Sequence, residues 1–203
     1  QKVWSSFAHV ADYCILVTRS DPESERHAGL TYLLVDMHAP GVEVRPLRQI
    51  TGEAEFNEIF FTGVEVPEEN VVGRPGEGFK IAMFSLDQGR FTVAAGATGL
   101  IRACRDASVT YAKQRKTFGV EIGQHQLVKE MIAQMESDYE ASRLLWLRSG
   151  WLKNTGTRNT RETGLAKWFA TVASERAAGD AVQIHGANGY SDEYPVGRFY
   201  RNC

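Results

Sequence analysis

Cysteine and excess charge are scarce in this 203-residue sequence. Its three cysteines, Cys14, Cys104 and Cys203, are too few and too scattered for a disulfide framework, and no CxxC or HExxH motif suggests a metal site. The 23 Lys and Arg against 25 Asp and Glu give a net charge of −2, which provides no electrostatic attraction for nucleic acid or an anionic membrane. We therefore expect neither metal nor nucleic acid as a partner.

Long apolar runs are also missing, since none approaches the roughly 20 residues of a membrane-spanning helix. The composition, 43% hydrophobic and 24% charged, is instead typical of a globular protein with a packed core. Reduced thiols are typical of the cytoplasm. We expect a cytoplasmic protein that does not contact a membrane.

Short β-branched and aromatic runs occupy the first third of the chain. ADYCILVTR (residues 11–19) and LTYLLVDM (30–37) are followed by GVEVRPL (41–47) and NEIFFTGVEVP (57–67), with glycine and proline at their ends. These runs predict a compact antiparallel sheet or barrel. We assign this β-domain to residues 1–74.

Proline is absent between Phe79 and Pro195, and apolar residues there recur three and four positions apart. This period predicts helices at about residues 78–114, 124–153 and 161–184, in a helical-bundle domain at 75–203. Five residues of the second helix fall on one face, as expected for a bundle core: Leu127, Met131, Met135, Tyr139 and Ser142.

Both ends of the chain look interrupted. QKVWSSF opens with strand-forming residues and no preceding turn, and GRFYRNC stops in an aromatic and basic segment without a polar tail. We therefore expect the chain to be a fragment of a longer protein.

The segment YAKQRKTFGVEIGQHQ connects the first two predicted helices. It is either a plain turn, with basic residues ending a helix, or a site where Arg115 and Thr117 hold a phosphate-bearing ligand beside the Phe118 ring. His125 and Gln126 open the next helix, where free backbone N–H groups favour an anion. The local sequence leaves both interpretations open.

Three further stretches have two interpretations each. QIHGANGY is a helix cap and turn, or a site where Gln183 reads a nucleotide through its amide. Trp4 in KVWSSF is a core residue, or a flat ring for a flat cofactor with a serine beside it. Asp87 and Arg90 in SLDQGR form a solvated ion pair, or they serve a ligand.

Taken in order, five segments resemble the acyl-CoA dehydrogenase family: KVWSSFAHVADYCILVTRSD, GVEVRPLRQITGEAEFNEIFFTGVEVPEENVVG, GEGFKIAMFSLDQGRFTVAAGATG, YAKQRKTFGVEIGQHQ and DAVQIHGANGYSDEYPVGRFYRN. The resemblance implies an α+β fold, with a small antiparallel β-barrel-like domain followed by an up-down four-helix bundle. It also implies that an N-terminal helical domain and the opening strands are missing, and that the last bundle helix is truncated.

The same resemblance implies FAD, bound between the two domains and shared between the subunits of a homodimer or homotetramer. Trp4 would cover the isoalloxazine and Ser6 would bond near its pyrimidine edge. From the neighbouring subunit, Arg115 and Thr117 would reach the pyrophosphate and Phe118 the adenosine. The remaining cofactor contacts implied are His125, Gln126, Gln183, Ile184, Gly186 and Ala187. Ala187 stands where relatives often have a second glycine.

The activity implied is α,β-dehydrogenation of an acyl-CoA thioester, with electrons passed to an electron-transfer flavoprotein. In most relatives the base that removes the proton is a glutamate that would lie beyond Cys203. Some relatives carry it at the position of Gly89, which has no side chain to accept a proton, so no catalytic residue is expected within the chain. Asp87, Gly89 and Arg90 would line the substrate channel. The alternatives are an acyl-CoA oxidase or flavin monooxygenase of the same fold, or a non-catalytic assembly module.

Overall fold

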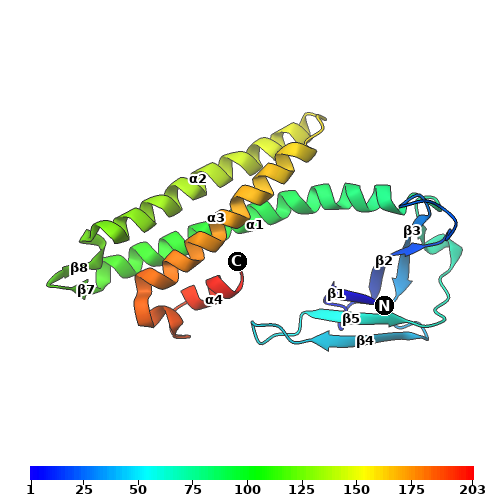
Figure 1. Cartoon of the computed structure of the whole chain (residues 1–203), viewed down its shortest axis with the longest axis horizontal. Helices are drawn as coiled ribbons and strands as arrows, with labels where there is room; N and C mark the ends of the chain where they lie inside the picture. The colour runs from blue at the N-terminus through cyan, green and yellow to red at the C-terminus, as the bar shows by residue number, and fades with distance from the viewer. The chain divides into compact units, whose positions relative to one another are not determined.

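The computed structural model describes all residues, 1–203, and the chain divides into two compact units, Gln1–Leu86 and Asp87–Cys203. The first unit contains six of the eight strands, and the second contains the other two and most of the helical residues. Helix α1 (Gly78–Gln114) begins in the first unit and continues through the second (Figure 1). The domain boundary placed at residue 74 stays a prediction.

Six strands build the first unit: β1 (Lys2–Ser6), β2 (Tyr13–Arg19), β3 (Leu30–Asp36), β4 (Val42–Leu47), β5 (Phe56–Phe61) and β6 (Val71–Val72). They pair antiparallel in two three-stranded sheets, in the orders β1-β5-β4 and β2-β3-β6. The two sheets share no ladder, so the barrel-like domain expected from the sequence is not a closed barrel. The 3-10 helix η1 (Glu68–Asn70) precedes β6.

Apolar side chains from both sheets meet in one small core. Ile59 of β5 and Met37, just after β3, are buried there with Ala8, and Cys14 of β2 packs against them. Alternation along β2 and β5 places Cys14 and Ile59 on the buried faces of their strands. The β-branched runs in the sequence therefore predicted the strands correctly.

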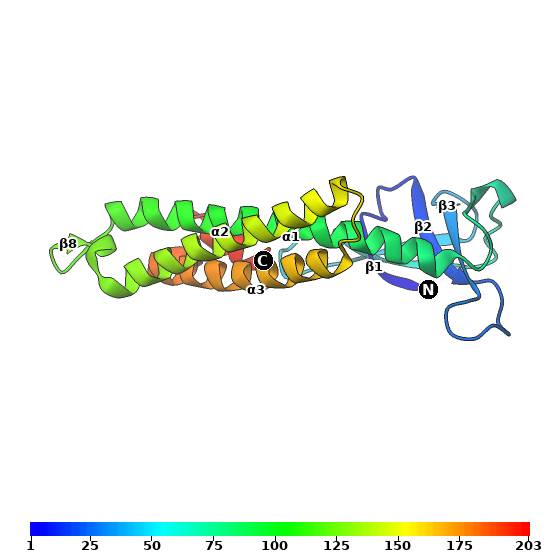
Figure 2. The same ribbon diagram turned by 90° about the horizontal axis from the view of Figure 1, so that it is seen from above.

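Helices α2 (Gln126–Asn154), α3 (Thr160–His185) and α4 (Val196–Arg201) follow α1. The long helices begin and end within a few residues of the predicted bounds, and α2 and α3 form an antiparallel pair (Figure 1). Seen from above, the three long helices lie side by side (Figure 2). The hairpin of β7 (Lys116–Thr117) and β8 (Val120–Glu121) and the 3-10 helix η2 (Ile122–Gln124) connect α1 to α2, and η3 (Gly186–Tyr190) follows α3. None of the helices has the length and apolar character needed to cross a membrane.

Small residues let the helices approach closely in the core of the second unit. Ala173, Ala177 and Ala181 of α3 are almost fully buried and recur at helical spacing, and they pack with Ile101 of α1 and Met135 of α2. Cys104 lies in the same core, where burial raises the pKa of its thiol to about 12. This thiol therefore stays protonated near neutral pH, consistent with a packing role.

The predicted core stripe of α2 is correct for Met131, Met135 and Tyr139 but wrong for Leu127, which is 74% exposed. Val128 takes its place against the core. The reason is geometric, because steps of four residues advance about 40° more than a full helical turn and drift off the buried face.

Candidate functional site

The RKTFG segment forms a two-residue hairpin at the end of α1. Lys116 pairs with Glu121 and Thr117 with Val120, which leaves Phe118 and Gly119 as the turn. Both have positive φ, 51° and 82°, as a type I′ turn requires. Glycine adopts this conformation freely, whereas phenylalanine rarely does, and the Phe118 ring is 97% exposed. The turn interpretation explains Gly119 and leaves Phe118 without a packing role.

The side chains around this hairpin include an unpaired cation. No hydrogen bond or ion pair engages the Arg115 guanidinium, although its backbone N–H donates to the Tyr111 carbonyl at 2.9 Å. Thr117 Oγ1 lies 3.0 Å from His125 Nε2, and the Phe118 ring meets the His125 ring edge-on at 6.2 Å. Arg115 thus provides a free charge for an anion. The single O–H of Thr117 is available to the same anion in the tautomer in which His125 Nε2–H donates to Oγ1.

A cavity of about 270 Å³ brings this hairpin together with the segment that follows α3. It is lined by Tyr111, Arg115, Thr117, Ile122, Ile184, His185, Gly186, Ala187 and Asn188. Five of the predicted cofactor-binding residues therefore share one cavity, although about seventy positions separate the two segments in the sequence. Gly186 has φ 59°, a conformation that glycine adopts without strain, and the residue is exposed.

Aromatic stacking holds the two walls of this cavity together. The Tyr111 and His185 rings stack at 4.2 Å, and Asn188 Nδ2 donates to the Tyr111 hydroxyl at 2.9 Å. His185 Nδ1 lies 2.8 Å from the Ala181 carbonyl, so this nitrogen carries the proton, and burial lowers the pKa of the imidazole. The sequence had given Tyr111 and Asn188 no role, although both lie inside the segments singled out.

Six predicted cofactor residues do not line this cavity: Trp4, Ser6, Phe118, His125, Gln126 and Gln183. Gln126 begins α2 and Gln183 lies in the last turn of α3, and both side chains are exposed. His125, at the N-cap of α2, makes no capping hydrogen bond through its side chain. The roles of these three residues stay predictions.

Trp4 and Ser6 lie on β1 in the first unit. The Trp4 side chain is 63% exposed and touches the Phe56 ring only edge-on, at 6.0 Å. A core tryptophan would be buried, so the packing interpretation of Trp4 is wrong for this chain. Ser6 is exposed on the same strand, paired with Phe56.

Asp87, Gly89 and Arg90 lie on α1 within the second unit. Arg90 Nη1 donates to Asp87 Oδ1 at 2.9 Å, and Thr160 Oγ1 donates to Asp87 Oδ2 at 2.8 Å. Asp87 is thus held from two helices, which makes the pair more ordered than an isolated surface ion pair. Gly89 is exposed, and a Cβ there would meet no atom within 4 Å.

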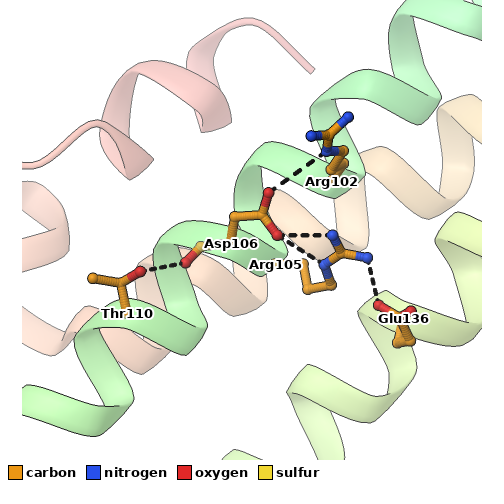
Figure 3. Close-up of polar contacts among 5 residues, drawn as sticks. All are labelled: Arg102, Arg105, Asp106, Thr110 and Glu136. Carbon is orange, nitrogen blue, oxygen red and sulfur yellow. Dashed lines mark hydrogen bonds and ion pairs between the residues drawn. The ribbon is translucent and has the colours of Figure 1, made fainter.

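A larger groove, about 780 Å³, lies between α1 and α2 and contains none of the predicted site residues. Arg105 spans it, with Nη1 at 2.5 Å from Glu136 Oε2 and Nη2 at 2.8 Å from Asp106 Oδ1 (Figure 3). Since this guanidinium is already paired with two carboxylates, it has little capacity left for a ligand. The arrangement is that of an ionic link between two helices.

Comparison with known proteins places these features in a family. The acyl-CoA dehydrogenase middle-domain model matches residues 1–64, and the acyl-CoA dehydrogenase C-terminal-domain model matches residues 76–203. Glutaryl-CoA dehydrogenase from Desulfococcus multivorans is 37% identical over 204 residues, covering 100% of this chain and 52% of that protein.

Solved structures give the same result. Butyryl-CoA dehydrogenase from Megasphaera elsdenii superimposes with a TM-score of 0.92 at 35% identity, over 99% of this chain and 53% of that one. A chain in a structure of the electron transferring flavoprotein of Acidaminococcus fermentans superimposes with a TM-score of 0.93 at 35% identity. The match covers 99% of this chain and 53% of that one. The chain spans about half the length of the curated relatives it matches. With both domain models matched in order, the chain belongs to the acyl-CoA dehydrogenase family.

Proposed function

We propose that the full-length protein is an FAD-dependent dehydrogenase that forms a double bond between the α and β carbons of an acyl-CoA thioester. The observation that carries this proposal is the cavity in which the unpaired Arg115 guanidinium, the Thr117 hydroxyl and the exposed backbone at Gly186 meet. Names of relatives, such as glutaryl-CoA and butyryl-CoA dehydrogenase, support the substrate class.

The residues present fit FAD by their chemistry. Arg115 and Thr117 would hold the pyrophosphate, since a guanidinium and a hydroxyl suit phosphate oxygens. Ile184, Gly186 and Ala187 would form the opposite wall. The exposed rings of Phe118 and Trp4 would cover the adenosine and the isoalloxazine. The chemistry that bound FAD supplies is acceptance of the hydride from the β carbon.

On the substrate side, Asp87 and Arg90 would line the channel for the thioester and pantetheine arm. Asp87 orients the Arg90 guanidinium through their 2.9 Å hydrogen bond, which leaves other Arg90 N–H groups as donors for substrate carbonyl oxygens. Gly89 would leave room for the chain of the substrate. The base that removes the α-proton would come from a carboxylate outside residues 1–203.

The exposed ring of Phe118 supports a site completed by a second subunit. A ring that is 97% exposed has almost no packing partners within its own chain. In the proposed homodimer or homotetramer, Phe118 would face the cofactor of the neighbour together with the other predicted cofactor residues of the second unit: Arg115, Thr117, His125, Gln126, Gln183, Ile184, Gly186 and Ala187. The proposed electron acceptor is an electron-transfer flavoprotein, and the proposed compartment is the cytoplasm.

The test uses the full-length protein loaded with FAD and a panel of acyl-CoA thioesters that includes glutaryl-CoA and butyryl-CoA. We expect at least one thioester to be converted to its enoyl-CoA while a dye or an electron-transfer flavoprotein is reduced. Mass spectrometry of the thioester identifies the product. Turnover with oxygen as the only acceptor would assign an oxidase instead, and no thioester conversion with any acceptor would contradict the proposal.

Replacing Arg115 with alanine is expected to weaken FAD binding by about 1.5 to 3 kcal/mol, roughly 10- to 150-fold in the dissociation constant, because a charge-assisted contact is lost. Arg115→Lys should recover only part of the lost FAD affinity, since lysine keeps the charge but not the planar guanidinium that can donate two parallel hydrogen bonds. Flavin titration of the full-length apoprotein measures this. Lys113→Ala is the matched control, because Lys113 carries the same charge in the last turn of α1 and does not line the cavity. Equal FAD affinity in Arg115→Ala and wild type would contradict the ligand-binding interpretation and favour the interpretation of the hairpin as a plain turn.

A further inference from the structure

We propose that Asn57 is a positioning residue for Trp4 and Ser6, because its buried amide holds the irregular backbone from which both side chains project. This inference rests on the proposed function, in which Trp4 and Ser6 contact the flavin. It adds a residue from the neighbouring strand, β5, whose side chain is buried away from any ligand.

The backbone at Trp4 is irregular, and the Trp4 side chain makes few contacts that could stabilise it. Lys2 pairs with Ile59 and Ser5 with Asn57, so Val3 and Trp4 lie opposite the single residue Glu58. This is a β-bulge, in which Trp4 has φ 61°. A bulky side chain rarely adopts that conformation, and the exposed indole gains little packing to offset the strain. Some other contact must hold the bulge.

Asn57 makes that contact. Its side chain is fully buried, and Nδ2 lies 3.1 Å from the Ser5 carbonyl, 3.1 Å from the Glu55 carbonyl and 3.3 Å from His9 Nδ1. An amide nitrogen has two hydrogens, and the two nearer acceptors, both carbonyls, fix which way the amide faces. The Glu55 carbonyl also accepts from the Phe7 backbone N–H. Asn57 thereby ties β1 to β5 at the point where the bulge ends.

The Ser5 carbonyl, which accepts from Asn57, lies between the two side chains to be positioned. Ser5 lies between Trp4 and Ser6, the two residues proposed to face the flavin, so a bond to its carbonyl constrains both neighbours. The single oxygen of the Asn57 amide, Oδ1, is buried without a hydrogen-bond partner. Such an atom destabilises a core, so an apolar side chain would suit a position that served packing alone. The carbonyls of Ser5, on β1, and of Glu55, just before β5, account for an amide here.

The test replaces Asn57 with leucine, which has a similar size and no donors, in the full-length protein. We expect the FAD dissociation constant to rise about five- to tenfold and the emission of bound flavin to increase, because a displaced indole stacks less and quenches less. Ile59→Val is the control, since Ile59 is equally buried on the same face of β5 but packs through apolar contacts and has no side-chain hydrogen bond to β1. It should leave flavin emission unchanged. If Asn57→Leu fails to fold, Asn57→Ser is measured against the same control for FAD affinity and flavin emission. Serine keeps one hydrogen-bond donor, but its shorter side chain loses the second donor of the amide.

A double-mutant cycle separates positioning from general loss of stability. In a Trp4→Ala, Ser6→Ala background the side chains to be positioned are gone, so Asn57→Leu should add nothing to the change in flavin binding. Equal effects of Asn57→Leu in both backgrounds would overturn the inference and leave the proposed function intact. If Trp4→Ala and Ser6→Ala themselves leave FAD affinity and flavin emission unchanged, the flavin contact itself is refuted. The two failures are thus distinguishable.

Discussion

Replacing Arg176 with alanine is expected to lower the free energy of unfolding by about 3 kcal/mol, because it leaves a buried carboxylate without its cation. Asp138 of α2 is buried, and Arg176 of α3 donates to its Oδ2 from Nη2 at 2.6 Å and from Nε at 3.2 Å. Gln134 donates to Oδ1 at 3.0 Å. After the substitution only this neutral donor remains, and the charge stays desolvated.

Urea unfolding of the full-length protein, followed by circular dichroism of its helices, measures the change. Arg161→Ala is the control, since Arg161 also lies on α3 and contacts Glu162 but is 76% exposed. Exposed pairs contribute about 0 to 1 kcal/mol, so the control should change little. Equal losses in the two variants would mean that burial of Asp138 adds nothing to the pair.

Truncating Met135 to alanine is expected to cost about 2 to 5 kcal/mol, because it opens a cavity among helices α1, α2 and α3. Met135 is 1% exposed and packs in the core with Ile101 and Ala177. The surrounding alanines have no flexible side chains with which to fill the space. The same urea experiment measures the loss.

Leu127→Ala provides the comparison on the same helix. Leu127 is 74% exposed, so its truncation removes little buried surface and should change the free energy of unfolding by no more than about 0.5 kcal/mol. A loss at Leu127 as large as that at Met135 would show that another surface covers Leu127 in the full-length protein.

Local patterns predicted the helices and strands well, because those depend on neighbours in the sequence. The proline-free stretch with its helical period gave α1, α2 and α3 nearly to the residue, and the β-branched runs gave β2 to β5. The arrangement of the strands was harder to predict. Pairing of β1 with β5 joins residues fifty or more positions apart, and no short pattern specifies such a partner or the division into two sheets.

The same limit applies to the site. Arg115, Thr117 and Gly186 were identified from their own segments. Their sharing of one cavity depends on the stacking of Tyr111 on His185, two residues far apart in the sequence. Likewise, nothing near Asp87 in the sequence indicates its hydrogen bond to Thr160. For Trp4 the local sequence fits both burial and exposure, and only the bulge on β1 decides between them.

The two-residue hairpin at Phe118 and Gly119 has a consequence for the entropy of binding. Its backbone is already fixed by the Lys116–Glu121 and Thr117–Val120 pairs, so contact with a ligand restricts little more than the two torsions of the Phe118 ring. A longer, flexible loop would lose about 1 to 2 kcal/mol per residue on becoming ordered. An aromatic ring on so short a turn can therefore stay exposed when alone and still contact a planar ligand at a small entropic cost.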